Sequence, residues 1–236
     1  MNFRNKKRTI NLYLLSSLVA VIFLFTSCDD NDDVVLEPTE VAYVSIYHGS
    51  PNTTGLDIDV GNGPINVLPF EYEDYSGYLN FYPGNRHFVL AENDNPSNIV
   101  LDTTFTFFGD DIYSIFIADS LSSLEAIAIE DNFVDLTDDI SAIRFIHLSP
   151  DTEAVNVLAD TESIFEARSF KDGTDFIPIE EGRVTLEVKS DENDEVLLTV
   201  PNVDLEDHEY YTVILNGYKT PPEGNINELS SDIIRH

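Results

Sequence analysis

The chain has 236 residues, and its 44 acidic residues against 12 lysines and arginines give a formal net charge of −32. This charge argues against nucleic acid as a partner, because affinity for nucleic acid comes from basic side chains that neutralise phosphates. A single cysteine excludes an intrachain disulfide framework and a cysteine-rich zinc site, whereas a hydrophobic content of 42% with 15 Phe and 11 Tyr predicts a folded protein.

Residues 1–27 have the organisation of a secretory signal peptide. Four basic residues precede an apolar stretch from Leu12 to Phe25, and the small residues Thr26 and Ser27 follow it. A basic start, a short apolar centre and small residues before a cleavage point are typical of such segments. The apolar stretch is shorter than the ~20 residues that a membrane-spanning helix needs. A short uncleaved anchor is the alternative.

The only cysteine of the chain, Cys28, directly follows these small residues. Its position resembles the lipobox of bacterial lipoproteins, in which the cysteine is lipidated and becomes the first residue of the mature chain. The lipobox usually has leucine three residues before the cysteine, where this chain has Phe25. The resemblance implies a membrane partner through a lipid anchor at Cys28, and a location in the outer membrane.

Residues 28–40 are rich in acids, and we expect them to form a linker. The run from Asp29 to Asp33 resembles the surface-export tether of Bacteroidetes lipoproteins. This resemblance implies display on the cell surface, with a periplasm-facing location as the alternative. The run can also be interpreted as a solvated, self-repelling linker and nothing more. Removal of residues 1–27 leaves 8 basic residues against 44 acidic ones, a net charge of −36 that favours solubility.

The rest of the chain contains an internal repeat. Residues 44–51 match residues 143–150, and two later blocks match in the same order at nearly the same offset. Three separated matches in one order predict two tandem units, which we place at residues 41–132 and 139–236. Each unit lies within the size range of a small domain with its own core.

Both units show the two-residue periodicity of β-strands. In the first strand Val44, Ile46 and His48 share one face. Further alternating runs follow at residues 56–60, 78–82, 87–91, 99–107, 113–118 and 124–129. Clusters rich in Gly, Pro, Asn and Asp separate the runs. The pattern predicts an all-β fold of two tandem immunoglobulin-like antiparallel β-sandwich domains. At the end of the second unit, only Ile233 and Ile234 offer a closing strand.

The recurring block resembles DUF4397, a family of domains of unknown function. Its pattern is an apolar strand that runs into His-x-Ser-Pro, then a Val-Asp-Val-like alternation, a Pro-Gly-like turn and a late Tyr-Thr pair. The motif residues in this sequence are His48, Ser50, Pro51, His147, Ser149 and Pro150. The resemblance covers about residues 41–218 and implies an extracytoplasmic β-domain, often in tandem, without an established activity. Asn156 departs from the acidic residue that is usual at its place.

The repeated histidine and serine of this motif leave two alternatives. One is a nucleophile–base pair in a hydrolase that acts on carbohydrate or another envelope substrate. The other is a structural role, because His48 is in phase with the apolar face of its strand. In addition, Ser50 precedes proline, which favours extended backbone and a hydroxyl that caps the turn. The sequence has no Gly-x-Ser-x-Gly elbow. We therefore expect no catalytic residue.

Asp57 and Asp59 offer hard oxygen ligands at the entry to a glycine-rich turn, as Ca²⁺ prefers. The segment lacks the third acidic ligand and the distal glutamate of an EF-hand loop, and the second unit does not repeat it. Calcium is therefore a candidate cofactor, and a calcium-stabilised adhesion domain is a further alternative for the function. The other interpretation is that these acids simply face solvent.

An aromatic stretch of the first unit is a candidate binding surface. Its tyrosines are Tyr72, Tyr75, Tyr78 and Tyr82. A tyrosine-rich rim can stack on sugars or hold a protein, so we expect a protein or glycan partner of unknown identity. The alternative is that these rings pack between the two units. Together these features predict a non-catalytic binding or structural module at the cell surface.

Overall fold

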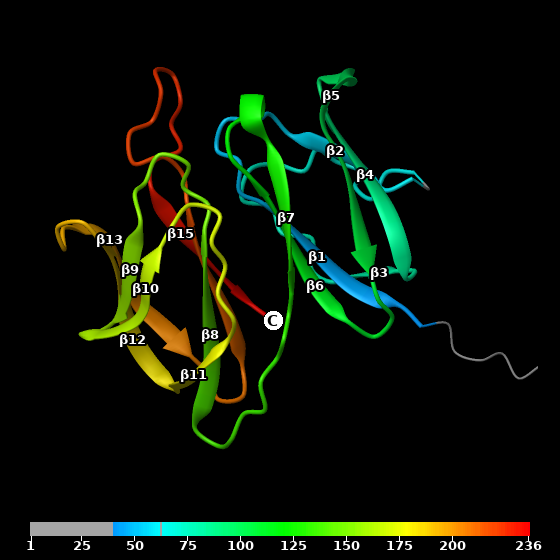
Figure 1. The fold of residues 1–236 in the computed structure, drawn as a ribbon. Helices are drawn as coiled ribbons and strands as arrows, with labels where there is room; N and C mark the ends of the chain where they lie inside the picture. Colours follow the sequence, from blue (N-terminus) through cyan, green and yellow to red (C-terminus); the bar gives the residue numbers. More distant parts are fainter. Residues whose placement is uncertain (1–39, 62) are drawn as a thin grey trace, which may run out of the picture. The chain divides into compact units, whose positions relative to one another are not determined.

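The computed structural model describes residues 40–61 and 63–236, so the expected signal peptide and Cys28 lie outside the described residues. Residues Glu40–His236 form one compact unit. The described residues contain fifteen β-strands, the 3₁₀ helix η1 (Leu121–Ser123) and no α-helix (Figure 1). They also contain no helix long and apolar enough to cross a membrane. The predicted all-β sandwich architecture is confirmed.

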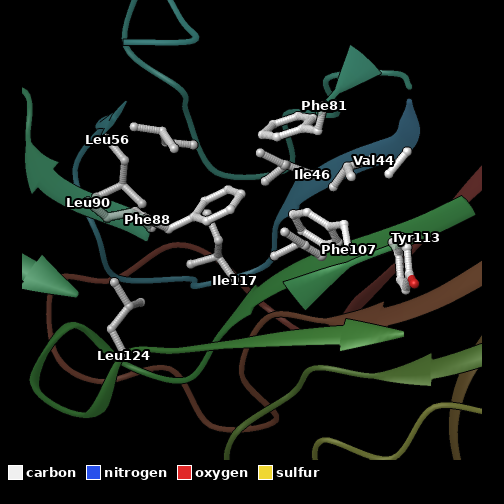
Figure 2. Close-up of a cluster of buried hydrophobic side chains, with 13 residues drawn as sticks. Val44, Ile46, Leu56, Phe81, Phe88, Leu90, Phe107, Tyr113, Ile117 and Leu124 are labelled. Atoms are coloured by element: carbon white, nitrogen blue, oxygen red, sulfur yellow. The ribbon is translucent and has the colours of Figure 1, made fainter. Parts of the chain in front are cut away.

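The first copy of the repeat, β1–β7, forms two sheets with the strand orders β3-β1-β6-β7 and β2-β4-β5. The strands are β1 (Ala42–His48), β2 (Leu56–Asp59), β3 (Leu79–Phe81), β4 (Gly84–Glu92), β5 (Asn95–Phe107), β6 (Ile112–Ala118) and β7 (Glu125–Glu130). Between the sheets lies a core to which β1 contributes Val44 and Ile46 and β4 contributes Phe88 and Leu90 (Figure 2). The alternation of apolar residues along β1 and β4 builds this core, because successive side chains of a strand point to opposite faces.

The second copy, β8–β15, has the orders β11-β8-β14-β15 and β10-β9-β12-β13. The strands are β8 (Ile140–His147), β9 (Val155–Ala159), β10 (Glu162–Arg168), β11 (Ile177–Glu180), β12 (Gly182–Ser190), β13 (Val196–Leu205), β14 (Tyr210–Asn216) and β15 (Ser230–Arg235). Its core includes Phe145 from β8, Val157 from β9 and Leu186 from β12. The closing strand that Ile233 and Ile234 predicted exists, since β15 pairs antiparallel with β14.

One detail differs from the expected antiparallel sheets. β1 pairs with β6 in parallel, and β8 pairs with β14 in parallel. A parallel pair needs a long crossover connection, which local alternation does not reveal. In the first copy the chain between β1 and β6 supplies that connection, because it crosses to the other sheet and builds β2, β4 and β5 there.

The sheets that contain β1 and β8, called here the inner sheets, pack against each other through their second faces. Their shared cluster consists of Tyr47, Phe116, Ala118, Ile146, Leu148, Ile214 and Ile234. Alternation predicted a single apolar face for β1, yet Tyr47 on the opposite face is only 1% exposed. This face is buried because the second copy covers it.

Glycine is required at the start of β4 and of β12, at equivalent places in the two copies. Gly84 has a φ of 99° and Gly182 a φ of 136°. Backbone with such positive φ values is readily adopted only by a residue without a Cβ atom. Gly84 and Gly182 therefore mark a tight turn that the two copies share.

Candidate functional site

His48 is the last residue of β1 and is fully buried. Its Nδ1 accepts a hydrogen bond from the backbone N–H of Ser50 at 3.3 Å, so the proton lies on Nε2, which is 2.9 Å from Oγ1 of Thr53. The rings of Phe70 and Tyr72 lie 6.2 and 6.4 Å from the imidazole. Burial lowers the pKa of His48 to about 4, which leaves it neutral at pH 7. These contacts fix the following turn and favour the structural alternative.

The second copy repeats the arrangement with different partners. His147 is fully buried at the end of β8, its Nε2 is 3.2 Å from the backbone oxygen of Glu153, and burial lowers its pKa. The hydroxyl of Ser149 lies 2.6 Å from that of Thr152. In the part of the chain that the structure describes, neither motif serine has its hydroxyl bonded to a histidine. The arrangement therefore lacks the contact that activates a serine nucleophile.

The motif prolines follow at the turns, and the one in the first copy contacts the second copy. The carbonyl oxygen of Pro51 accepts hydrogen bonds from the side-chain amides of Asn225 and Asn227, at 2.9 and 2.6 Å. Both asparagines belong to the loop between β14 and β15. Pro150 holds the equivalent place after Ser149 in the second copy. The turn that His48 fixes is thus also part of the contact between copies.

Three of the four candidate tyrosines are partly buried. Tyr75 packs against the cluster between the inner sheets, and the hydroxyl of Tyr78 donates to Asp131 Oδ2 at 2.7 Å. Tyr72 lies beside the buried histidine of β1. Tyr82 is 62% exposed. The structure therefore does not gather these four tyrosines into one exposed surface.

A buried ion pair joins the two copies. Arg144 on β8 is 1% exposed, and Nη1 of its guanidinium donates to Asp131 Oδ1. Its Nη2 donates to Ser114 Oγ at 2.9 Å, and its Nε donates to Thr212 Oγ1 at 2.7 Å. Asp131 also accepts a hydrogen bond from Ser114 Oγ at 2.7 Å. The guanidinium carbon lies 4.5 Å from the ring centre of Phe176. Burial of both charges is tolerated because each is paired and hydrogen-bonded.

His236, the residue directly after β15, completes this network. Its Nε2 is 2.7 Å from Thr212 Oγ1 and its Nδ1 is 3.0 Å from the hydroxyl of Tyr78. Burial, together with the positive charge of Arg144, lowers the pKa of His236 to about 4. The ring is therefore neutral at pH 7 and adds no second positive charge beside the guanidinium.

A second polar cluster lies elsewhere at the same contact. The hydroxyl of Tyr47 donates to Asp232 Oδ2 at 2.5 Å and accepts from the side-chain amide of Asn216 at 2.6 Å. Asn216 also donates to Glu73 Oε1 at 3.3 Å. Burial and the neighbouring carboxylate of Asp232 raise the pKa of Glu73. The cluster links β14 and β15 of the second copy to β1 and the loop between β2 and β3 of the first, so two separate polar networks fix the contact.

Apart from Tyr78, the members of these networks were not singled out from the sequence. Arg144 carries a signal that could have found it, because it is the one charged residue in the apolar run of residues 140–147. A charge inside such a run requires a buried partner. Asp131 carries no comparable signal, since it is one of 44 acidic residues.

The two aspartates proposed for calcium have protein partners. Asp57 Oδ1 accepts from the side-chain amide of Asn93 at 2.9 Å, and Asp59 Oδ1 accepts from the backbone N–H of Gly61 at 2.6 Å. Among residues 40–61 and 63–236, no group of three or more His, Cys, Asp or Glu side chains could hold a metal ion. Calcium at this turn stays a prediction. Equal thermal midpoints in Ca²⁺ and in EDTA would remove it.

A family model described as a domain of unknown function (DUF4397) matches residues 42–157 and, again, residues 141–229. The chain belongs to the DUF4397 family. The two matches confirm the tandem arrangement inferred from the repeated His-x-Ser-Pro blocks. In this DUF4397 chain, both repeated histidines are buried at the ends of parallel-paired central strands.

Similarity of this DUF4397 chain to solved structures is remote. A streptococcal virulence factor, whose structure is described as showing α-glucan binding, is 11% identical, with 72% of this chain and 92% of that chain covered and a TM-score of 0.23. The fimbrial anchor protein Mfa2 from Porphyromonas gingivalis is 8% identical, with 82% and 97% covered and a TM-score of 0.21. Such scores carry no argument about function. No curated protein matches the chain.

Proposed function

We propose that this chain is a lipid-anchored, extracytoplasmic module that binds or supports other molecules at the cell surface without catalysing a reaction. In this proposal the lipid at Cys28 attaches the chain to the outer membrane, and residues 28–40 space the folded part from it. Residues 40–236 then act as one body that presents its loops to a protein or glycan partner.

The observation that carries the non-catalytic part is the complete burial of the recurring polar residues. His48, Ser50, His147 and Ser149 are all 0% exposed. A general base must reach a substrate proton, and its pKa should lie near the working pH. His48 meets neither condition, because it is enclosed by aromatic rings and its pKa is lowered to about 4.

The contact between copies supports a presenting role. The buried Arg144–Asp131 pair and the Tyr47–Asp232 hydrogen bond each join residues of different copies. Polar groups at a buried contact require defined partners, since leaving one unpaired costs more than an apolar mismatch. They therefore favour one relative placement of the copies. A fixed placement suits a module whose loops must face a partner together.

The experiment is metabolic labelling with a palmitate analogue in a bacterium that exports the protein, combined with protease treatment of intact cells. The wild-type chain is expected to take up label and to be cleaved by external protease. Cys28→Ala is expected to lose the label, whereas the matched control Ser27→Ala, which keeps the cysteine, should retain it. Label that survives in Cys28→Ala would reject the anchor. Resistance of the wild type to protease would reject surface exposure and favour the periplasm-facing location.

A further inference from the structure

The two copies differ beside the equivalent strands β2 and β9. In the second copy β10 pairs with β9, and Phe165 stands opposite Val157. Phe165 is 4% exposed, and its ring lies stacked on that of Phe145 at a centroid distance of 6.2 Å. Two phenyl rings therefore fill this side of the second core.

In the first copy, smaller side chains take both places. Ile46 is the repeat equivalent of Phe145, and Asn66 stands beside β2. Asn66 Oδ1 accepts from the backbone N–H of Ile58 at 2.8 Å, and Asn66 Nδ2 donates to the carbonyls of Leu56 and Leu68 at 2.9 and 2.7 Å. The asparagine thus replaces the backbone bonds of a neighbouring strand but supplies no ring to the core.

A cavity of about 210 Å³ lies at this place in the first copy. It is lined by Ile46, Ile58, Ile65, Asn66, Phe70, Ser76 and Leu79. The polar atoms of the Asn66 amide are bonded to backbone, so aliphatic and aromatic groups dominate the wall. Apolar cavities of roughly 150 Å³ accept benzene, so this volume is sufficient for a phenyl ring.

A second hollow of about 350 Å³ shares the side chains of Ile65 and Leu79 with this cavity and adds Val60, Asn80, Phe81, Tyr82 and Arg86. Figure 2 shows Ile46, from the deeper cavity, and Phe81, from the second hollow, directed into the same core. The matching hollow of the second copy, about 530 Å³, is also lined partly by apolar side chains and contains Arg183, but it adds the four acids Asp160, Glu162, Glu180 and Glu181. The hollow of the first copy thus has a basic residue and no acid, whereas acids outnumber the one basic residue in the hollow of the second copy.

Arg86 supplies the charge at the first hollow. Its Nε donates to the carbonyl of Tyr82 at 2.7 Å, and its Nη2 donates to the carbonyl of Pro83 at 2.9 Å. These bonds orient the guanidinium and leave three of its five N–H groups for other acceptors. Among the described residues Arg86 belongs to no ion pair, although acids outnumber bases in the chain almost fourfold. An oriented guanidinium beside apolar walls suits a carboxylate attached to an apolar group.

We propose that the first copy binds a small aryl carboxylate, with the ring in the 210 Å³ cavity and the carboxylate at Arg86 in the adjoining hollow. The ring takes the place that Phe165 holds in the second copy. This site goes beyond the proposed function and does not depend on the lipid anchor, since all described strands and hydrophobic clusters lie within residues 40–236.

The test uses the compact unit 40–236, its folding checked by circular dichroism, with 3-phenylpropionate as the probe and 3-phenylpropan-1-ol as its neutral counterpart. Binding is measured by calorimetry and by methyl NMR of the isoleucines. The expected result is saturable binding of 3-phenylpropionate that shifts the methyl signals of Ile46, Ile58 and Ile65. An absence of saturable shifts at millimolar probe would overturn the proposal.

Two kinds of variant locate the site. Ile46→Phe introduces the side chain that Phe145 has in the second copy, and it should abolish binding of both probes. If this variant misfolds, Leu79→Phe fills the same cavity from β3. Arg86→Gln should weaken 3-phenylpropionate about tenfold and the alcohol less than twofold, because only the acid uses the guanidinium. Arg183→Gln, at the hollow of the second copy, is the matched control and should change neither. Undiminished binding in a folded, filled variant would refute the cavity, and equal effects of Arg86→Gln on both probes would refute the carboxylate.

Discussion

The buried ion pair between the copies makes a sharp prediction for Asp131→Asn. The substitution keeps the size of the side chain and removes its charge. Arg144, at 1% exposure, would then keep its charge without a counter-ion. The guanidinium would retain its hydrogen bonds to Ser114 and Thr212, which are neutral acceptors.

The expected cost follows from burial. Removing one partner of a buried ion pair typically costs about 3–5 kcal/mol, because the remaining charge is left uncompensated in a medium of low dielectric constant. The same chain offers a matched exposed pair. Arg183 and Asp204 make two hydrogen bonds, at 2.9 and 2.8 Å, with their side chains 62% and 61% exposed. Solvent screens this pair, so Asp204→Asn should cost much less than Asp131→Asn.

The assay is urea unfolding of residues 40–236, followed by tyrosine fluorescence and far-ultraviolet circular dichroism. The free energy of unfolding should fall by about 3 kcal/mol or more in Asp131→Asn and by much less in Asp204→Asn. The double variant Asp131→Leu with Arg144→Met, which removes both charges, should recover part of the loss. Similar costs for the buried and the exposed pair would refute the argument that this contact depends on compensated charge.

Two further predictions concern protonation and backbone geometry. In the folded chain the pKa of His48 and the pKa of His236 are both lowered to about 4. Between pH 6.5 and 4 the unfolded chain therefore binds more protons than the folded chain. The free energy of unfolding falls as the pH falls through this range, by on the order of 3 kcal/mol for each histidine. Urea unfolding across this range should therefore show a shallower pH dependence in His236→Gln than in the wild type. An unchanged slope would contradict the neutral state of the partly buried His236. Gly217 has a φ of 73°, and a Cβ atom there would lie 2.1 Å from the backbone oxygen of Glu228, whereas Gly224, with a φ of 84°, has open space around it. For Gly224→Ala we expect only backbone strain, which costs roughly 1–2 kcal/mol. Gly217→Ala should destabilise the chain by clearly more, because the added Cβ atom also collides with the backbone. Equal thermal midpoints of the two variants would contradict this prediction and show that the loop before β15 adjusts freely.

Local patterns predicted much of the fold because strand formation in this chain follows alternation. The run predicted at residues 99–107 lies within β5, and the run at 113–118 lies within β6. The pairing of these strands was less accessible. The parallel contact of β1 with β6 joins segments more than 60 residues apart, and no local pattern encodes which strand becomes the neighbour.

The candidate site was predicted less well, for a related reason. The histidines were correctly placed on the apolar faces of their strands, since position within a strand is a local property. The sequence left two alternatives for the tyrosines, an exposed binding surface or packing between the two units; Tyr82 is 62% exposed, whereas Tyr75 and Tyr78 lie at the contact between copies. Exposure of a strand face depends on what packs against it, which is not a local property.

The sequence by itself determined that residues 40–236 form strands, that their blocks recur as two copies, and that His48 and His147 occupy equivalent places. These are consequences of side-chain alternation and of duplication, both of which are visible along the chain. Only the tertiary structure decided that the inner sheets bury a second face and that Arg144 pairs with Asp131 across the contact. It also decided that the first copy has a cavity beside Ile46 and Asn66, at the place that the rings of Phe145 and Phe165 fill in the second copy. Each of these depends on the volume and charge of residues that are distant in sequence and become neighbours only when the sheets pack.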